Sequence, residues 1–123
     1  MRIITAISLT LASLGSCQPA AVTNACPQHT QTALRAGWSR SELAKVSRTA
    51  FRESRCKPTA FNGRGRDRSY GLLQINTKGA NWSELQRRCH LTSKAQLFDP
   101  YTNLACAHTL RMAYGWKPWA GGA

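Results

Sequence analysis

Five carboxylic acids are the only acidic side chains in this chain of 123 residues, so each can be weighed separately for acid–base chemistry. Glu53 differs from the others because it lies beside Val46 and near Ala50, at the edge of the apolar face of a predicted helix. Burial disfavours the charged form of a carboxyl group, and a carboxyl group that keeps its proton near neutral pH can act as a general acid. Glu53 is therefore the candidate catalytic acid. The structural alternative is an ion pair with Arg52, Arg55 or an arginine of the following loop.

The other four acids have ordinary structural explanations. Glu42 and Asp99 stand at predicted helix starts, where their side chains cap free backbone N–H groups. Glu84 lies in a polar helical stretch next to two arginines, where a solvated ion pair is expected. Asp67 follows Glu53 in a loop, as a turn former between two arginines. By itself, each of these four favours a structural role.

The five cysteines indicate disulfides rather than a metal site. The gaps between the last four are 30, 33 and 17 residues, with no C-x-x-C pair and no closely spaced His pair, so we expect no metal and no cofactor. An even set of four can pair completely in an oxidising compartment, and the sequence alone permits three pairings. The four are Cys26, Cys56, Cys89 and Cys106.

The N-terminus has the pattern of an export signal, with the first helix of a core as the alternative. Arg2 supplies the positive charge, residues 3–14 form an apolar run, and small residues follow. This run is too short to cross a membrane, which takes roughly 20 apolar residues. The sequence L-G-S-C at 14–17 resembles the lipobox of bacterial lipoproteins, in which the thiol, here that of Cys17, carries a membrane-anchoring lipid.

The length fits a single domain behind this leader. We expect a signal peptide at residues 1–16 and a tether at residues 17–27, which is small, polar and contains two prolines. Residues 28–123 then form the domain. The expected location is the periplasm or cell envelope, lipid-anchored or secreted.

Helices are the predicted framework of this domain. Apolar spacing, capping residues and helix-ending glycines or prolines mark each of them. A Gly- and Arg-rich stretch at 60–68 is expected to be a mobile loop, and residues 69–76 a short strand or hairpin. The predicted helices lie at about 28–36, from the S-R-S-E capping box at 39–42 until Pro58, at 81–89 and at 101–114.

The strong positive charge raises the question of a nucleic-acid partner. The chain has 17 Lys plus Arg against 5 Asp plus Glu, a formal net charge of +12. These basic residues are scattered, and no zinc-finger, RNP or basic-zipper pattern is present, so we expect no nucleic acid as partner. A positive surface instead suits an envelope rich in carboxylates and phosphates, where attraction raises encounter rates.

Four segments occur together in a recognisable order. They are Glu53-Ser54 followed by Pro58, Ala60 and Asn62; S-Y-G-L-L-Q-I-N at 69–76; L-F-D-P-Y-T-N at 97–103 with Cys106; and G-W-K-P-W at 115–119. This pattern resembles the lysozyme superfamily, in particular the soluble lytic transglycosylases and the goose-type and phage lysozymes, and more distantly the animal c-type lysozymes. The resemblance covers about residues 40 to 120. It implies a mainly α (α+β) fold with a small β-hairpin beside the catalytic cleft.

The resemblance also implies the roles of individual residues. Glu53 takes the place of the general acid that cleaves the β-1,4 bond between N-acetylmuramic acid and N-acetylglucosamine in peptidoglycan. Trp119 takes the place of an aromatic wall against the acid. Peptidoglycan strands are then the partner, and we expect a monomer. The residues in the places of the groove-lining hairpin residues are Ser69, Tyr70, Gly71, Gln74 and Asn76.

One departure from the c-type pattern bears on the reaction. Ser69 stands where those lysozymes have a second carboxylate, so a pair of carboxylates about 5 Å apart is absent unless Asp67 takes that role. Lytic transglycosylases manage with one carboxylate, because the 6-hydroxyl of the substrate attacks the anomeric carbon. We therefore expect a lytic transglycosylase. The alternatives are a hydrolytic lysozyme using Asp67 or a water-activating group, and a glycan-binding module without turnover.

The resemblance selects one disulfide pairing. Cys106 takes the place of a c-type lysozyme cysteine that bonds back to a preceding segment, which here contains Cys89. Cys26 is then left to pair with Cys56, which follows Glu53 closely.

Overall fold

The computed structural model describes residues 25–122. The predicted signal peptide, Cys17 with its expected lipid, and the tether up to residue 24 lie outside the described residues. Between residues 25 and 122, no helix has the length and apolar character needed to cross a membrane.

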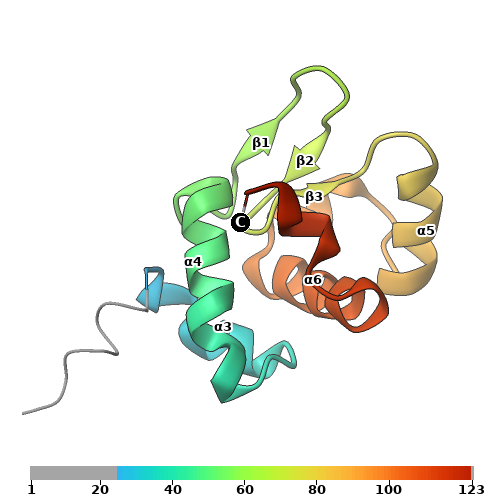
Figure 1. Ribbon diagram of the computed structural model, residues 1–123. Helices are drawn as coiled ribbons and strands as arrows, with labels where there is room; N and C mark the ends of the chain where they lie inside the picture. Colours follow the sequence, from blue (N-terminus) through green and yellow to red (C-terminus); the bar gives the residue numbers. More distant parts are fainter. Residues whose placement is uncertain (1–24, 123) are drawn as a thin grey trace, which may run out of the picture.

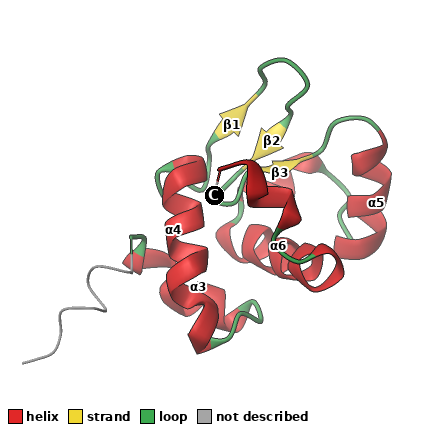
Figure 2. Ribbon diagram, viewed as in Figure 1, coloured by secondary structure: helices red, strands yellow, loops and turns green. Residues whose placement is uncertain are grey.

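The fold is mostly helical, with a small antiparallel sheet (Figure 2). Short 3-10 helices, labelled η, alternate with the α-helices. This architecture confirms the predicted mainly α (α+β) class. In chain order the elements are η2 (Pro27–His29), α3 (Thr30–Arg35), η3 (Arg40–Glu42), α4 (Leu43–Ser54), β1 (Phe61–Asn62), β2 (Ser69–Tyr70), β3 (Ile75–Asn76), α5 (Ala80–Cys89), η4 (Lys94–Phe98), α6 (Pro100–Tyr114) and η5 (Lys117–Gly122).

Two predicted caps begin the helices that matter most for the site. Ahead of η3 and α4, the backbone N–H of Ser39 donates to Oε1 of Glu42 at 3.1 Å, as a capping box requires. Ahead of α6, the carboxylate of Asp99 accepts from the backbone N–H of Thr102 at 2.9 Å, with Pro100 in the first helical position. Both predicted helix starts are confirmed.

The apolar face of α4 is narrower than the sequence predicts. Val46 and Ala50, one turn apart, are buried, whereas Phe51 is 41% exposed. The apolar spacing of Leu43, Val46, Ala50 and Phe51 predicts that all four share one face, and this is wrong for Phe51, which is rotated by about 140° from Val46 around the helix axis. The helix also ends earlier than predicted. Its last residue is Ser54, since Arg55 adopts a left-handed conformation with φ of 55°.

The sheet has three antiparallel strands in the order β1-β2-β3. Phe61 lies opposite Tyr70 across β1 and β2, and Ser69 lies opposite Asn76 across β2 and β3. Part of the stretch 60–68, predicted as a loop, is therefore strand, because the Phe61 and Tyr70 rings pack edge-to-face at 5.0 Å and favour pairing. Figure 1 shows the β1–β2 hairpin projecting from the helices, with β3 nearer the centre.

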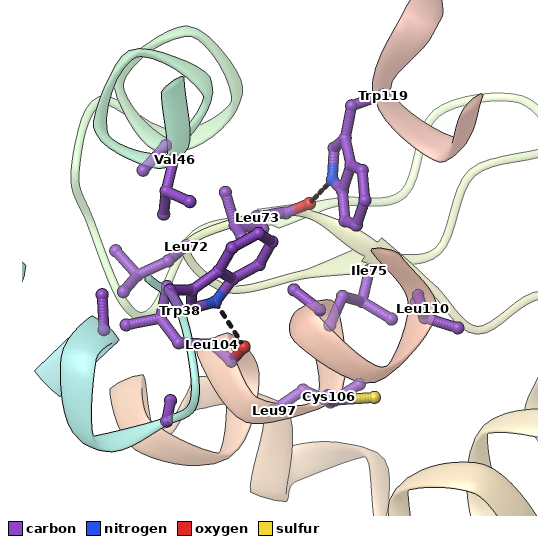
Figure 3. Close-up of a cluster of buried hydrophobic side chains, with 14 of the residues drawn as sticks. Trp38, Val46, Leu72, Leu73, Ile75, Leu97, Leu104, Cys106, Leu110 and Trp119 are labelled. Atoms are coloured by element: carbon purple, nitrogen blue, oxygen red, sulfur yellow. Dashed lines mark hydrogen bonds between the residues drawn. The ribbon is translucent and has the colours of Figure 1, made fainter. Parts of the chain in front are cut away.

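The core lies where α3, α4, α6 and the turn between β2 and β3 meet (Figure 3). Two buried tryptophans fasten it, each through its indole N–H. Trp38 donates to the carbonyl of Leu104 in α6 at 2.9 Å, and Trp119 of η5 donates to the carbonyl of Leu73 at 2.7 Å. Because Leu73 belongs to the turn beside β3, the second bond fixes η5 against the sheet region.

Two disulfides complete the framework, and both have the predicted pairing. Cys26 bonds to Cys56 with Cα atoms 5.6 Å apart, which joins the start of the domain to the residues just after α4. Cys89 bonds to Cys106 with Cα atoms 5.2 Å apart, which joins the end of α5 to the middle of α6.

Candidate active site

Glu53 lies in the last turn of α4, with 25% of its side chain exposed. Nη2 of Arg52 donates to Oε2 of Glu53 at 3.1 Å and to the backbone carbonyl of Trp119 at 3.1 Å. The ion pair expected as the structural alternative is therefore present. It also connects the candidate acid to η5, which Figure 1 shows beside this end of α4.

The end of α4 is held by local and covalent contacts. The hydroxyl of Ser54 donates to the carbonyl of Ala50 at 2.9 Å, and the N–H of Arg55 donates to the carbonyl of Phe51 at 2.9 Å. Cys56, two residues after α4, is tied to the start of the domain by its disulfide. These contacts fix the backbone that carries Glu53.

A buried asparagine organises the turn between β2 and β3. Oδ1 of Asn103 accepts from the N–H of Leu73 at 3.0 Å, and its Nδ2 donates to the carbonyls of Tyr70 at 2.8 Å and Leu97 at 2.9 Å. Gly71 has φ of 78°, and a Cβ there would lie 2.3 Å from both the amide nitrogen of Asn103 and the carbonyl oxygen of Leu97. Only glycine fits this position. Asn103 lies in the motif at 97–103, but no individual role was predicted for it. The pattern that could have identified it is a polar residue on a helix face whose other residues are apolar.

Three of the predicted hairpin residues point into the protein's own structure. Ser69 is buried within the sheet. The Tyr70 ring lies between Phe61 at 5.0 Å and Phe98 at 5.1 Å. Gly71 packs against α6 as described above. Ser69 and Gly71 therefore shape the turn, and Tyr70 is partly buried between two aromatic rings.

Gln74, Asn76 and Trp119 come together around one cavity. It has a volume of about 280 Å³ and lies between β3, α5, the end of α6 and η5. Glu53 does not line it, but reaches the Trp119 backbone through Arg52. The lining residues are Gln74, Ile75, Asn76, Asn81, Glu84, Leu85, Leu110, Tyr114, Pro118 and Trp119.

Backbone hydrogen bonds hold the two amide side chains of the cavity. Nε2 of Gln74 donates to the carbonyls of Ala60 at 3.2 Å and Gly71 at 3.0 Å. Oδ1 of Asn76 accepts from the N–H groups of Arg68 at 3.1 Å and Lys78 at 3.0 Å. This pattern leaves Oε1 of Gln74 as an acceptor and Nδ2 of Asn76 as a donor for a ligand.

Glu84 is the carboxylate that lines the cavity, and sequence reasoning did not place it there. Oε2 of Glu84 accepts from the hydroxyl of Tyr114 and from Nε of Arg88 at 2.6 Å. Hydrogen bonds from Tyr114 and Arg88 hold the pKa of Glu84 below its ordinary value. The ion pair with Arg88 confirms the predicted helical pairing. Tyr114 lies 30 residues away in the chain, so no local signal marked this contact.

Asp67 lies apart from this cavity, in the loop between β1 and β2. Its Oδ2 accepts from Nδ2 of Asn62 at 3.3 Å, and its backbone N–H donates to the carbonyl of Arg64 at 2.8 Å. These are the contacts of a turn-forming aspartate. Among residues 25–122, no group of three or more His, Cys, Asp or Glu side chains is arranged to hold a metal ion.

Comparison with known protein families gives a match over most of the chain. The model of a family described as "Lysozyme like domain" matches residues 30–121 of the chain. Searches of the curated proteins and of the solved structures found no match. The matched range includes α4 with Glu53, the three strands, α6 and all but the last residue of η5. The chain therefore belongs to the lysozyme-like domain family.

Proposed function

We propose that the protein cleaves the β-1,4 bond between N-acetylmuramic acid and N-acetylglucosamine in peptidoglycan, as a lytic transglycosylase with Glu53 as its one catalytic carboxylate. The observation that carries this proposal is the connection from Glu53 through Arg52 to Trp119, which lines the cavity with Gln74 and Asn76. In a chain of the lysozyme-like domain family, an acid at a helix end beside a polar and aromatic cavity supports glycan cleavage.

The reaction needs one group that gives and then takes a proton. Protonated Glu53 donates its proton to the glycosidic oxygen as the bond from that oxygen to the anomeric carbon breaks. The 6-hydroxyl of the muramic acid residue then attacks its own anomeric carbon, and its proton passes to the Glu53 carboxylate. The products are a 1,6-anhydro end and a free 4-hydroxyl, and no water is consumed.

Arg52 orients the carboxyl group of Glu53. Its Nη2 donates to Oε2 of Glu53 at 3.1 Å, which leaves Oε1 to give and take the proton. Arg52 also donates a hydrogen bond to the carbonyl of Trp119, so it connects Glu53 to a residue that lines the cavity.

The surroundings of Glu53 support a one-carboxylate reaction over a two-carboxylate one. Ser69, in the place of the second carboxylate of c-type lysozymes, is buried in the sheet. Asp67 accepts a hydrogen bond from Asn62 in the β1–β2 loop. Glu84 lies on the other wall of the cavity, where it accepts hydrogen bonds from Arg88 and Tyr114. A water-activating carboxylate beside Glu53 is thus not supplied by these groups.

The two disulfides fit a protein that folds in an oxidising compartment, such as the bacterial envelope where peptidoglycan lies. The positive charge of the chain supports the same substrate, because peptidoglycan and its surroundings carry carboxylates and phosphates.

The test is digestion of purified peptidoglycan sacculi by the unmutated protein and by Glu53→Gln. Gln keeps the shape of Glu53 and removes the proton-transfer group, so the rate of glycan release should fall by about 100-fold or more. Circular dichroism should show the same fold for both proteins. Asp67→Asn is the matched control, and it should keep most of the activity.

Undiminished release by a folded Glu53→Gln protein would overturn the assignment of the acid. A loss for Asp67→Asn as large as that for Glu53→Gln would favour the two-carboxylate hydrolase instead. An unmutated protein that binds sacculi but releases no fragments would be a glycan-binding module.

A further inference from the structure

We propose that Glu84 is a glycan-binding residue, which hydrogen-bonds the donor groups of an N-acetylated sugar at the end of the groove farther from Glu53. This inference rests on the proposed function, since it assumes that a glycan strand occupies the cavity. It assigns a binding role to a carboxylate whose sequence context indicates only a surface ion pair.

The cavity has two walls of different origin. One wall is the β3 region with η5, where Gln74, Asn76 and Trp119 lie. The opposite wall comes from α5 and the last residue of α6, where Glu84 and Tyr114 lie. Glu53 connects to the first wall through the Trp119 backbone, and Figure 1 shows α5 on the side of the molecule away from α4, so the second wall is the one farther from the proposed chemistry.

The hydrogen bonds of Glu84 leave part of its carboxylate for a ligand. Both bonds, from the Tyr114 hydroxyl and from Nε of Arg88, end on Oε2. Two donors on one oxygen fix the orientation of the carboxylate and leave Oε1 to accept further hydrogen bonds. The side chain is 32% exposed, so this oxygen is reachable from the cavity that the residue lines.

The remaining lining matches the chemistry of an N-acetylated sugar. Hydroxyl and acetamido N–H groups are donors, which suit Oε1 of Glu84 and Oε1 of Gln74, and the acetamido carbonyl is an acceptor, which suits Nδ2 of Asn76. The C–H faces of a sugar ring are apolar and pack against rings such as those of Trp119 and Pro118. A carboxylate placed among such groups fits a neutral, donor-rich ligand and disfavours an anion.

A purely structural role for Glu84 makes a different prediction. In that case the carboxylate only clamps α5 onto α6, through Arg88 on its own helix and Tyr114 on the other. Breaking the clamp from the Arg88 side should then weaken ligand binding as much as removing Glu84 does. Arg88 does not line the cavity, and its side chain covers the Tyr114 ring at 5.2 Å, so Arg88→Met breaks the ion pair while keeping that packing.

The test measures the Kd of the β-1,4 hexamer of N-acetylglucosamine by calorimetry. The parent protein carries Glu53→Gln, so that the ligand stays intact. Adding Glu84→Ala should weaken binding about tenfold or more, as the loss of a hydrogen bond to a charged group does. Adding Arg88→Met should change the Kd by less than about twofold. Adding Glu84→Gln, which keeps one acceptor oxygen, should recover part of the affinity.

Equal affinity of the parent and the Glu84→Ala protein would overturn the inference and leave the proposed function standing. An equal loss for Glu84→Ala and Arg88→Met would also overturn it, in favour of the clamp. If the parent binds no hexamer while the unmutated protein still cleaves sacculi, only the inference fails. If neither binding nor cleavage is found, the proposed function fails as well.

Discussion

The turn between β2 and β3 and the C-terminal end of α4 are both hydrogen-bonded to Trp119, but they are built in opposite ways. Leu72 and Leu73 in the turn are fully buried, and one buried asparagine, Asn103, makes three hydrogen bonds to the backbone around it. Glu53 on α4 is partly exposed, and its contact is a single ion pair with a neighbouring arginine.

In the proposed mechanism, this difference separates a binding surface from a reacting group. Buried hydrogen bonds that satisfy both polar atoms of the Asn103 side chain hold the turn in one conformation. This keeps Gln74 and the following strand in place before a ligand binds. An exposed ion pair contributes little to stability and exchanges readily with solvent or ligand. The proposed proton transfer by Glu53 would therefore not disturb the fold, because the backbone just after Glu53 is held by the Cys26–Cys56 disulfide.

Gly71→Ala should have the largest effect on stability, because it places a methyl group in the tightly packed, buried turn. The new Cβ would lie 2.3 Å from Asn103 and from the carbonyl of Leu97, at a backbone φ of 78°. The left-handed conformation and the steric overlap together should lower the free energy of unfolding by about 4 kcal/mol. Urea denaturation measures this loss.

Gly65→Ala is the matched control for that variant. Gly65 also has a positive φ of 56°, but a Cβ there would meet nothing within 4 Å. Its cost should be only that of the backbone conformation, about 1 kcal/mol. Equal costs for the two variants would show that the packing against Asn103 does not hold the turn.

The disulfides should produce the next largest effect, and they should differ in what they disturb. Replacing Cys26 and Cys56 by serine opens a loop with a sequence separation of 30 residues and should cost roughly 3 kcal/mol. It should also lower the rate of sacculus digestion, because it frees the segment that follows Glu53. Replacing Cys89 and Cys106 should cost a similar free energy of unfolding and leave that rate nearly unchanged at a temperature where both variants are folded.

Thermal unfolding and digestion rates, measured on both serine pairs, separate the two effects. If the second pair lowered the rate as much as the first, the end of α4 would have no special dependence on its own disulfide.

Features that depend on neighbouring residues could be predicted from the sequence, whereas contacts between distant segments could not. Capping residues are local, so the starts of α4 and α6 were predictable from Ser39-Arg40-Ser41-Glu42 and Asp99-Pro100. Glu53 stood out because a carboxylate at the edge of an apolar face has few structural explanations. The close packing of Gly71 on Asn103 and the bond from Tyr114 to Glu84 depend on how distant segments meet. No local pattern records such contacts, so the packing of Gly71 on Asn103 and the place of Glu84 in the cavity came from the structure.

The smallest effect is expected at the other end of α4, where contacts are also charged and partly exposed. Burial raises the pKa of Glu42, but hydrogen bonds from Ser39 and the charge of Arg111 outweigh it, so this pKa lies below its ordinary value of 4.5. A carboxylate with a lowered pKa stabilises the folded protein above its ordinary pKa, and this stabilisation is lost as the pH falls through the lowered value. Glu42→Gln keeps the capping geometry and should cost about 0.5–1 kcal/mol at pH 7.

Chemical denaturation of the unmutated protein and of Glu42→Gln at several pH values measures this contribution. The difference between their free energies of unfolding should be largest above pH 4.5 and shrink below it. A difference that stays constant from pH 7 to pH 3 would mean that the charge of Glu42 contributes nothing.

The central claim is that Glu53 alone cleaves the glycan, with the 6-hydroxyl of the substrate as the nucleophile. Mass spectrometry of the fragments that the unmutated protein releases from sacculi tests it most directly. A transglycosylase leaves muramic acid with a 1,6-anhydro end, one water lighter than the reducing end that a hydrolase leaves. The account predicts anhydro ends from the earliest time points, and fragments with only reducing ends would contradict it.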